Sequence, residues 1–468
     1  MGWLWTAVVS TALVLCCTVS GCKSPPSRRL LPDTDGALFD GSIIFDVFKP
    51  DAQCGGLVCP LGCNVEAGRC NRLAPSNFDV QGFFDAEGLT VCPFCGCFPG
   101  ANTIVIDTDT GRIVCQNKGS VTIRPSGNPG LVLNGIFWDV TTQSTTGYPN
   151  LKLSVFGMKS FEVPLGWKLE VKGKLPVALY ATGDVKIEGQ VVSLPEMSDP
   201  GAGGFDGGSD TSRGMDGSPC PDESASGHGK AGEADPDRFS GGGGGGRKQI
   251  GGTGGDAGGA GGISLVLGGE GGQAVGNPEL TPLFGGCGGG TGRGAHMNHG
   301  GGGGGAIQIS ANGSLSISGM INMPGAGGGG GWTRVSNGGS GGGGGSGGAI
   351  LLEAAQIIVI GEGMITANGG GGGAGGFGSD GEGGQAAATP AKGGSSSWGG
   401  GGGGAGGARG TSSSSQDEPG GKGEDHPDSG GGGGGVAGRI RFNAPSINID
   451  PGAVVSPAPS ESKTVRTW

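Results

Sequence analysis

The sequence has little of the positive charge that a nucleic-acid partner would require. Lys and Arg total 29 against 40 Asp and Glu, which gives a formal net charge of -11. Binding to nucleic acid depends on lysines and arginines that neutralise phosphates. The charge balance therefore argues against nucleic acid as a partner, and we interpret the excess of acid as a solubilising surface.

Phosphate-binding, triple-helical and ice-binding patterns are missing as well. No GxxxxGK followed by Ser or Thr occurs, and GxGxxG arises by chance in a chain with 117 glycines among 468 residues. Glycine does not recur at every third position, and 28 prolines are too few for a collagen triple helix. Rows of threonine, which a crystal-binding solenoid would present, are absent from the sequence.

The sequence does contain an internal repeat of short alternating strands, each preceded by a glycine run. The copies begin GGGGGAIQIS at 301 and GGGSGGAILL at 343. Aligning them pairs these apolar residues: Ile307 with Ile350, Ile309 with Leu352, Leu315 with Ile358, Ile317 with Ile360, and Ile321 with Ile365. Two further copies contain Val177, Leu179, Val185 and Ile187, and Ile440, Phe442, Ile447 and Ile449.

This periodicity predicts the fold class. Apolar residues two apart, in strands about eight apart that restart after each glycine tract, indicate stacked coils of a β-solenoid. We predict an all-β protein built on a right-handed parallel β-helix that begins near residue 100, with long glycine-rich inserts and a small disulfide-rich knot before it. The side chains predicted to share one core are Ile307, Ile309, Ile350, Leu352, Ile440 and Phe442.

Residues 1–21 predict a signal peptide. They carry no charged side chain, and their apolar stretch is too short for a stable membrane span. Val19, Ser20 and Gly21 precede Cys22 as in the lipobox of bacterial lipoproteins, although Lys and Arg are missing near Met1. We expect the Cys22 thiol to be lipidated, and two or three acyl chains would anchor the protein to a membrane.

Export would leave ten cysteines in an oxidising compartment, where an even number indicates disulfides. The candidates are Cys54, Cys59, Cys63 and Cys70; Cys92, Cys95, Cys97 and Cys115; and the pair Cys220 and Cys287. The first four lie in a segment too short to build its own core. The CxxC of Cys92 and Cys95 is also compatible with zinc or redox chemistry, but no histidine is near, and we predict no metal or cofactor.

The remaining chain divides by composition. We predict a lipidated tether over 22–50, the knot over 51–72, a β-rich part over 73–176, and coils with glycine-rich inserts over 177–468. The inserts span about 194–305, 324–348 and 368–438. Two alternatives stay open for them: disorder, or extended polyproline-II segments that lie against one another and exchange backbone hydrogen bonds because no Cβ separates them.

Candidate catalytic and metal-binding groups are sparse. Asp109–Gly111 forms a DTG that lacks the second copy an aspartic protease needs, so a β-turn explains it and Asp107 better. The twelve-residue calcium loop with a closing Glu is absent. His296 and His299 lie between flexible glycines, a poor context for a metal site.

Enzymes on parallel β-helices often cleave acidic polysaccharides with groups on the outer face of neighbouring coils. The aligned outward positions are Ala178, Gln308, Leu351 and Arg441 in the first strand, and Lys186, Ser316, Val359 and Asn448 in the second. Acids occur at the third aligned position, as Glu188 and Asp450, with Ser318 and Gly361 between them. No stacked acid pair appears, so we expect a non-catalytic protein; a polysaccharide lyase or hydrolase is the alternative, with Glu188 and Glu353 as the outward carboxylates to test.

Three aromatic residues, Trp332, Phe377 and Trp398, lie within the glycine tracts. They are candidates for contact with sugars or a partner protein, or they pin the inserts together.

The lipobox, the segment GRCNRLAPSN at 68–77, IDTDTGRI at 106–113, and the GGAI repeats closing with GRIRFNA at 438–444 occur together. In these features the chain resembles a family of glycine-rich surface lipoproteins abundant in myxobacteria and related bacteria. The resemblance implies location and architecture but no mechanism. We expect an outer-membrane lipoprotein at the cell surface, favoured by Lys23 after the cysteine, that acts as a spacer or adhesin toward glycans or envelope proteins.

Overall fold

The computed structural model describes residues 54, 56, 59–80, 88–91, 93–97, 102–116, 120–143, 148, 150–209, 214–221, 226–235, 237–258, 265–294, 298–331, 339–397, 400–407 and 420–468. All of them belong to one compact unit, Phe48–Trp468. Cys22, the predicted signal peptide and the predicted tether lie outside the described residues. Within the described part, no helix combines the length and apolarity needed to cross a membrane.

The described chain is nearly all β, as predicted, and its one short helix is the 3-10 helix η2 (Pro93–Cys97). Two short antiparallel pairs stand apart from the large sheets: β1 (Cys63–Asn64) with β2 (Arg69–Cys70), and β14 (Ala234–Asp235) with β15 (Arg238–Phe239). One large sheet has the order β22 (Val454–Ser456), β19 (Met364–Thr366), β17 (Met320–Asn322), β13 (Gln190–Val192), β10 (Lys168–Lys172), β3 (Thr103–Asp107), β4 (Ile113–Gln116) and β5 (Ser120–Arg124).

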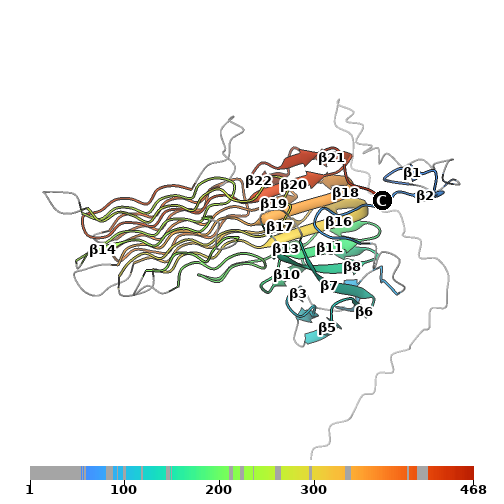
Figure 1. Cartoon of the computed structure of the whole chain (residues 1–468), viewed down its shortest axis with the longest axis horizontal. Coiled ribbons are helices and arrows are strands. Elements are labelled where there is room, and N and C mark those ends of the chain that lie inside the picture. Colours follow the sequence, from blue (N-terminus) through green and yellow to red (C-terminus); the bar gives the residue numbers. More distant parts are fainter. Residues whose placement is uncertain are drawn as a thin grey trace, which may run out of the picture. The chain divides into compact units, whose positions relative to one another are not determined.

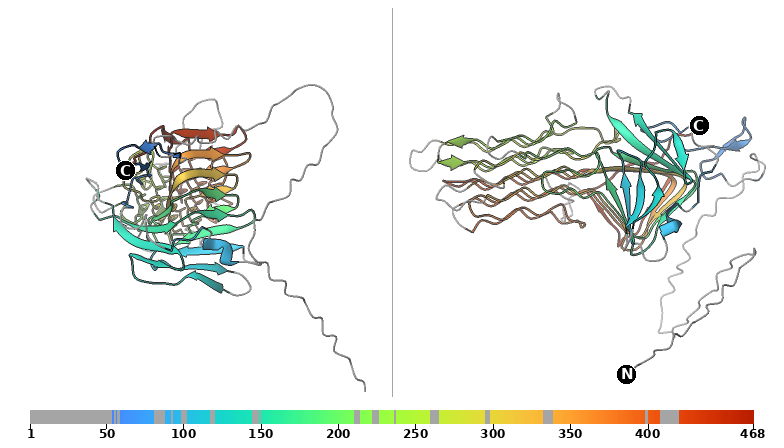
Figure 2. Two further views of the ribbon diagram at one scale, coloured as in Figure 1. Left: turned by 90° about the vertical axis from the view of Figure 1, so that its right-hand side faces the viewer. Right: turned by 90° about the horizontal axis from the view of Figure 1, so that it is seen from below.

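The second large sheet runs beside the first (Figures 1 and 2). In both sheets the order of neighbouring strands largely follows their order in the sequence. The order of the second sheet is β23 (Ser460–Ser462), β20 (Arg439–Asn443), β18 (Ala349–Val359), β16 (Ala306–Ile317), β11 (Val177–Ala181), β8 (Lys152–Met158), β7 (Ile136–Thr142) and β6 (Leu131–Leu133). Attached to this order are β12 (Val185–Ile187), β9 (Phe161–Val163) and β21 (Ser446–Ile449).

Both sheets are mixed. Pairing is parallel from β10 to β22 and from β8 to β23, but the hairpins β3–β4–β5 and β6–β7–β8 are antiparallel. Parallel pairing does begin near residue 100, since β3 pairs with β10 in parallel. The expectation of a purely parallel β-helix is wrong for these hairpins. The reason is local, since Asn134 and Gly135 have φ of 50° and 78° between β6 and β7, the left-handed conformation that a two-residue hairpin requires.

The register of the repeat is confirmed in the first strand and corrected in the second. Ile307 pairs with Ile350 and Ile309 with Leu352, but Leu315 pairs with Ile357 and Ile317 with Val359. The register shifts between Ala311 and Ser314, where β16 has one residue more than β18. Such a bulge leaves the period-2 pattern intact on both sides and moves the alignment by one, so Ile358 replaces Val359 as the outward residue of that coil.

The core predicted from the repeat is present. Ile307, Ile309, Ile350, Leu352, Ile440 and Phe442 are buried in one cluster with the inward residues of the other strands. A second cluster lies on the opposite face of the longer sheet, where Leu73, Val80, Leu280 and Leu283 pack over Ala178, Leu351 and their neighbours. Ala178, Gln308 and Leu351 do point away from the main core, as predicted, but their face is not open, because the chain before the sheets and part of the first insert return across it.

The three inserts form a bundle of extended segments that run side by side away from the strands (Figures 1 and 2). Successive N–H groups of one buried segment, 241–246, donate to three neighbouring segments in turn, at 2.8–3.0 Å. The acceptors are the carbonyl oxygens of Gly255, Gly341, Lys230, Gly252, Gly344 and Gly227, in that order. Every third residue thus faces the same neighbour, as three residues per turn of a polyproline-II helix requires.

This packing excludes side chains. A Cβ on Gly243 would lie 2.0 Å from the carbonyl oxygen of Glu270, and one on Gly343 would lie 2.0 Å from that of Gly243. On Gly432 the same atom would lie 1.9 Å from the oxygen of Gly342. Of the two alternatives for the inserts, packed extended segments are what the structure shows for the described parts, and glycine is required because backbones approach closer than any side chain permits.

Candidate binding groove

A surface groove of about 510 Å³ lies on the described part of the chain. It crosses four corners at which the chain turns from the longer sheet to the other, after β9, β12, β16 and β18. The corners lie at 165–168, 188–190, 318–320 and 362–364. The groove therefore follows the stacking direction of the strands.

Backbone hydrogen bonds between corners fix the groove. The N–H of Gln190 donates to the oxygen of Trp167, that of Met320 to Gly189, and that of Met364 to Gly319, each at 2.8 Å. At the ordinary strand spacing of about 4.8 Å, three such steps make the groove about 14 Å long. This length suits a linear chain laid across the coils.

Glycine keeps the floor of the groove open. A Cβ on Gly189 would lie 2.3 Å from the carbonyl oxygen of Trp167, and one on Gly319 would lie 2.0 Å from that of Gly189. Side chains are therefore excluded where these corners stack, and the side chains that line the groove form its two walls. The repeat alignment carried this signal, because a glycine follows Glu188 and Ser318 at the same place in two coils.

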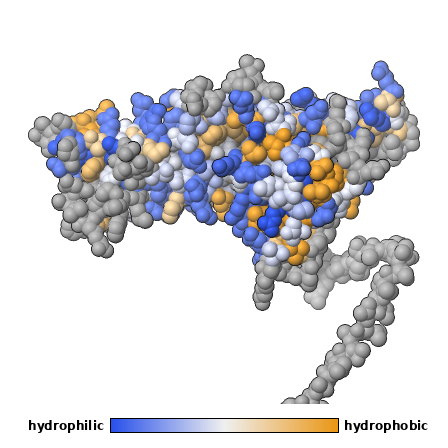
Figure 3. Space-filling model, turned by 60° about the horizontal axis from the view of Figure 1, so that its bottom comes forward, coloured by the Kyte–Doolittle hydropathy of each residue, from blue (hydrophilic) through white to orange (hydrophobic). Residues whose placement is uncertain are grey.

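The walls are apolar with polar groups between. Leu165 is 81% exposed, while Trp167, Met320 and Met364 are half-buried. Figure 3 shows hydrophobic residues gathered over the stranded part of the molecule. The Trp167 ring and the flexible thioethers of Met320 and Met364 lie beside Gln190. Sugar rings can stack on an apolar surface of this kind and donate hydrogen bonds to a neighbouring amide oxygen.

Of the charged groups that line the groove, Lys168 and Glu188 are held in ion pairs, Lys168 with Glu170 at 3.2 Å. Glu188 lies 2.8 Å from Lys186, which also lies 3.5 Å from Glu162. The hydrogen bond from Lys186 lowers the pKa of Glu188, and the same bond raises the pKa of Lys186. A catalytic general acid needs a raised pKa to hold its proton near neutrality, so the lowered pKa of Glu188 does not suit that role.

Glu353, expected as an outward carboxylate, is 2% exposed. Its oxygens accept from Gln308 Nε2 at 2.6 Å, Ser310 Oγ at 3.0 Å, Asn443 Nδ2 at 3.1 Å and the Ser76 N–H at 3.2 Å. Ser76 belongs to the segment that covers this face, which the repeat alone did not reveal. Glu353 therefore fastens that segment to the sheet and is closed to a substrate.

Of the other acidic and histidine residues singled out from the sequence, two aspartates accept hydrogen bonds from backbone N–H groups and one histidine makes a local contact. Asp107 Oδ1 accepts the N–H groups of Asp109 and Thr110 at 2.9 and 3.1 Å, which confirms the turn. Asp450 accepts the N–H of Gly361 at 2.8 Å. His299 contacts the neighbouring Gly300 oxygen at 3.3 Å, and His296 lies outside the described residues. No group of three His, Cys, Asp or Glu that could hold a metal occurs among the residues described.

Of the three aromatic candidates, Phe377 is 41% exposed in the bundle, away from the groove. Trp332 and Trp398 lie outside the described residues. Trp167 was not singled out from the sequence, because PLGW at 164–167 looks like an ordinary turn until the corners are stacked.

Four disulfides are present among the described residues: Cys54–Cys63, Cys59–Cys70, Cys97–Cys115 and Cys220–Cys287. The first two give the knot an interleaved connectivity that the sequence left open. The expected pair of Cys220 and Cys287 is formed. Cys92 and the side chain of Cys95 lie outside the described residues.

Comparisons with protein-family models, with curated proteins and with solved structures find no match to this chain.

Proposed function

We propose that the protein is a non-catalytic, lipid-anchored component of a bacterial cell envelope, with a right-handed parallel β-helix as its body and a stiff glycine bundle as its extension. The observation that carries this proposal is the backbone lattice of the bundle. Buried glycine segments such as 241–246 are bonded to neighbours in three directions, and a lattice of that kind resists bending in every direction. Such a part serves as a spacer or a rigid arm.

The proposed anchor is Cys22, attached through the tether over 22–50. The test is metabolic labelling with a fatty acid in the native host or a related bacterium, comparing the natural chain with Cys22→Ser. We expect the label to disappear and the protein to remain as precursor or become soluble. Unchanged labelling would remove the lipoprotein assignment. Protease shaving of intact cells then tests exposure at the outer membrane surface.

The adhesin role rests on the groove. We propose that its ligand is a linear glycan, with sugar faces against Trp167 and Leu165 and hydroxyl groups at Gln190. Because Leu165 is 81% exposed, Leu165→Ser changes the wall without touching the core. Losing one apolar wall contact of this size should weaken glycan binding about tenfold.

The experiment is a glycan-binding screen of purified residues 23–468, followed by titration of any hit. Leu267→Ser is the matched control, since Leu267 is 53% exposed and lies in the bundle. Equal affinities for all three proteins would reject the groove as the site. Glycan turnover that is lost in Glu188→Gln or Glu362→Gln would instead favour the polysaccharide lyase or hydrolase.

A further inference from the structure

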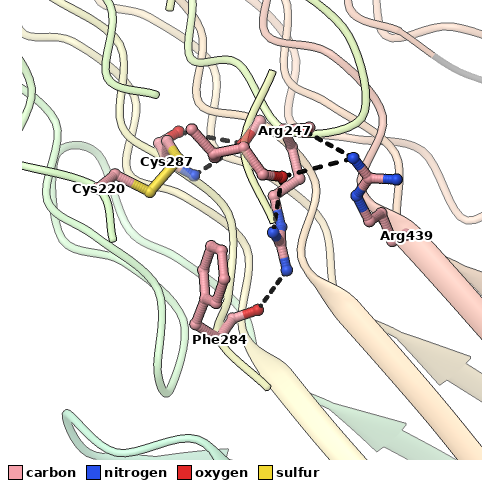
Figure 4. Close-up of a disulfide and its surroundings, with 7 residues drawn as sticks. Cys220, Arg247, Phe284, Cys287 and Arg439 are labelled. Carbon is pink, nitrogen blue, oxygen red and sulfur yellow. Dashed lines mark hydrogen bonds between the residues drawn. A yellow bond between two sulfur atoms is a disulfide. The ribbon is translucent and has the colours of Figure 1, made fainter. Parts of the chain in front are cut away.

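Two arginines meet where the glycine bundle joins the sheets (Figure 4). Arg247 ends the glycine run 241–246 and is completely buried, and Arg439 begins β20. Nη1 of Arg247 and Nη2 of Arg439 both donate to the carbonyl oxygen of Val275, at 3.2 and 3.5 Å. Two like charges are therefore held side by side.

The guanidinium of Arg247 is only partly compensated. Its Nη2 donates to the oxygen of Phe284 at 2.8 Å, and its Cζ lies 3.7 Å from the centre of the Phe284 ring. The buried Nε atoms of Arg247 and Arg439 have no hydrogen-bond partner among the described residues. Burial, with the charge of Arg439 added, lowers the pKa of Arg247 well below its usual range, yet arginine does not give up its proton in proteins.

No carboxylate of the described chain lies within 4.0 Å of either guanidinium. Glu279 acts on Arg439 from a greater distance, and its own side chain is exposed. Carbonyl dipoles and one aromatic face stabilise a cation weakly compared with a counter-charge. The buried charge of Arg247 and the half-buried charge of Arg439 therefore call for a negative partner that the described residues do not supply.

A small cavity lies at this place. It has a volume of about 40 Å³ and is lined by Lys248, Pro278, Arg439, Ile440, Ala458 and Ser460. Lys248 Nζ approaches it while donating to the oxygen of Ala458 at 3.4 Å. The volume exceeds what one water needs and is too small for an organic acid.

We propose that this cavity binds one small inorganic anion, such as chloride, between Arg439 and Lys248. The anion offsets the charge that Arg439 places beside Arg247, and it joins Lys248 and Pro278 of the first insert to the final strands (439–440 and 458–460). Its binding is thereby coupled to the attachment of the bundle to the sheets.

The test is thermal unfolding of the oxidised mature protein at constant ionic strength, with sodium chloride replacing sodium gluconate. Because gluconate is too large for the cavity, the unfolding temperature should rise by about 2 °C for each tenfold increase in chloride above its dissociation constant. Arg439→Gln should lose this dependence. The control is Arg112→Gln, which changes an exposed arginine in the β3–β4 hairpin and should retain it.

Crystals of the unaltered protein soaked in sodium bromide give a readout that does not depend on any variant folding. We expect an anomalous peak in the cavity, against Arg439 and Lys248. An unfolding temperature that is independent of chloride, or crystals with bromide elsewhere and none in this cavity, would overturn the proposal.

Discussion

In the stranded region the interior is filled by branched side chains, whereas in the glycine bundle it is filled by backbone. Ile307, Ile350 and Ile440 stack in the first region and remove apolar surface from water. In the second, buried segments such as 241–246 contribute only hydrogen bonds at close approach. Glycine loses the most conformational entropy on ordering, so the bundle gains order only because nearly every backbone group finds a partner at once.

The sheets and the bundle should therefore lose stability through opposite kinds of substitution. Removing a side chain should damage the sheets, and adding one should damage the bundle. The two regions are joined where the inserts leave the sheets. The contacts there decide whether unfolding of one region spreads to the other.

The largest effect is expected at the disulfide Cys220–Cys287, both cysteines of which belong to the first insert. Replacing both Cys220 and Cys287 by Ala opens a loop with a sequence separation of 67, which on the chain-entropy model lowers the free energy of unfolding by about 4 kcal/mol. We expect faster hydrogen exchange in the bundle and little change in the sheets. Replacing Cys54 and Cys63, a separation of 9 within the knot, is the control. Equal changes in hydrogen exchange in both regions would show that the Cys220–Cys287 disulfide stabilises the sheets as much as the bundle.

In the sheets, Ile350→Ala should lower the free energy of unfolding by about 2–5 kcal/mol, because it leaves a cavity in the main core. Ile358→Ala is the matched control in the same strand, since Ile358 is 9% exposed and lies outside that core. Chemical denaturation measures both. A larger loss for Ile358 would mean that the corrected register between β16 and β18 is wrong.

In the bundle, Gly343→Ala places a Cβ 2.0 Å from a carbonyl oxygen that cannot move without breaking its own lattice. Overpacking of this kind costs about 1–3 kcal/mol. Gly383→Ala is the control, because its nearest atom would be 3.6 Å away, and it should be neutral or slightly stabilising. If both alanines were tolerated equally in thermal unfolding, the bundle would not be packed as described.

The sequence was sufficient for the parts that repeat. Apolar residues at Ile307, Ile309, Ile350 and Leu352 fixed one face of each strand, and glycine runs marked the inserts. The bulge between Ala311 and Ser314 could not be predicted, because an extra residue preserves the alternation on either side.

The covered face and the groove were missed for a different reason. Ser76 meets Glu353 across 277 residues, and Trp167 meets Gln190 only when corners stack. Contacts between segments that do not repeat leave no period in the sequence. Apolar residues at the nominally outward positions, Ala178 and Leu351, were the one available sign that something covers that face.

The smallest effect is a pH response confined to the bundle. His228 lies in the first insert, where burial lowers its pKa, the charge of Lys230 lowers it further, and Asp216 opposes both. Lys230 Nζ lies 3.0 Å from Nε2 of His228 and 2.9 Å from Asp216. The neutral ring accepts this bond, so protonation would remove the acceptor and place two cations together.

Because the pKa of His228 is lower in the folded state, the unfolded chain binds more protons between the folded value and the ordinary value of about 6.5. The contribution of His228 to the free energy of unfolding is therefore complete above the ordinary value of about 6.5. It falls as the pH drops from there toward the folded pKa, by at most about 1.4 kcal/mol per pH unit. Thermal unfolding between pH 7.5 and 5 should show the loss, and His228→Gln should reduce the slope while His426→Gln retains it. If the slope survives in His228→Gln, another group is responsible and the bundle carries no acid-sensitive contact at this position.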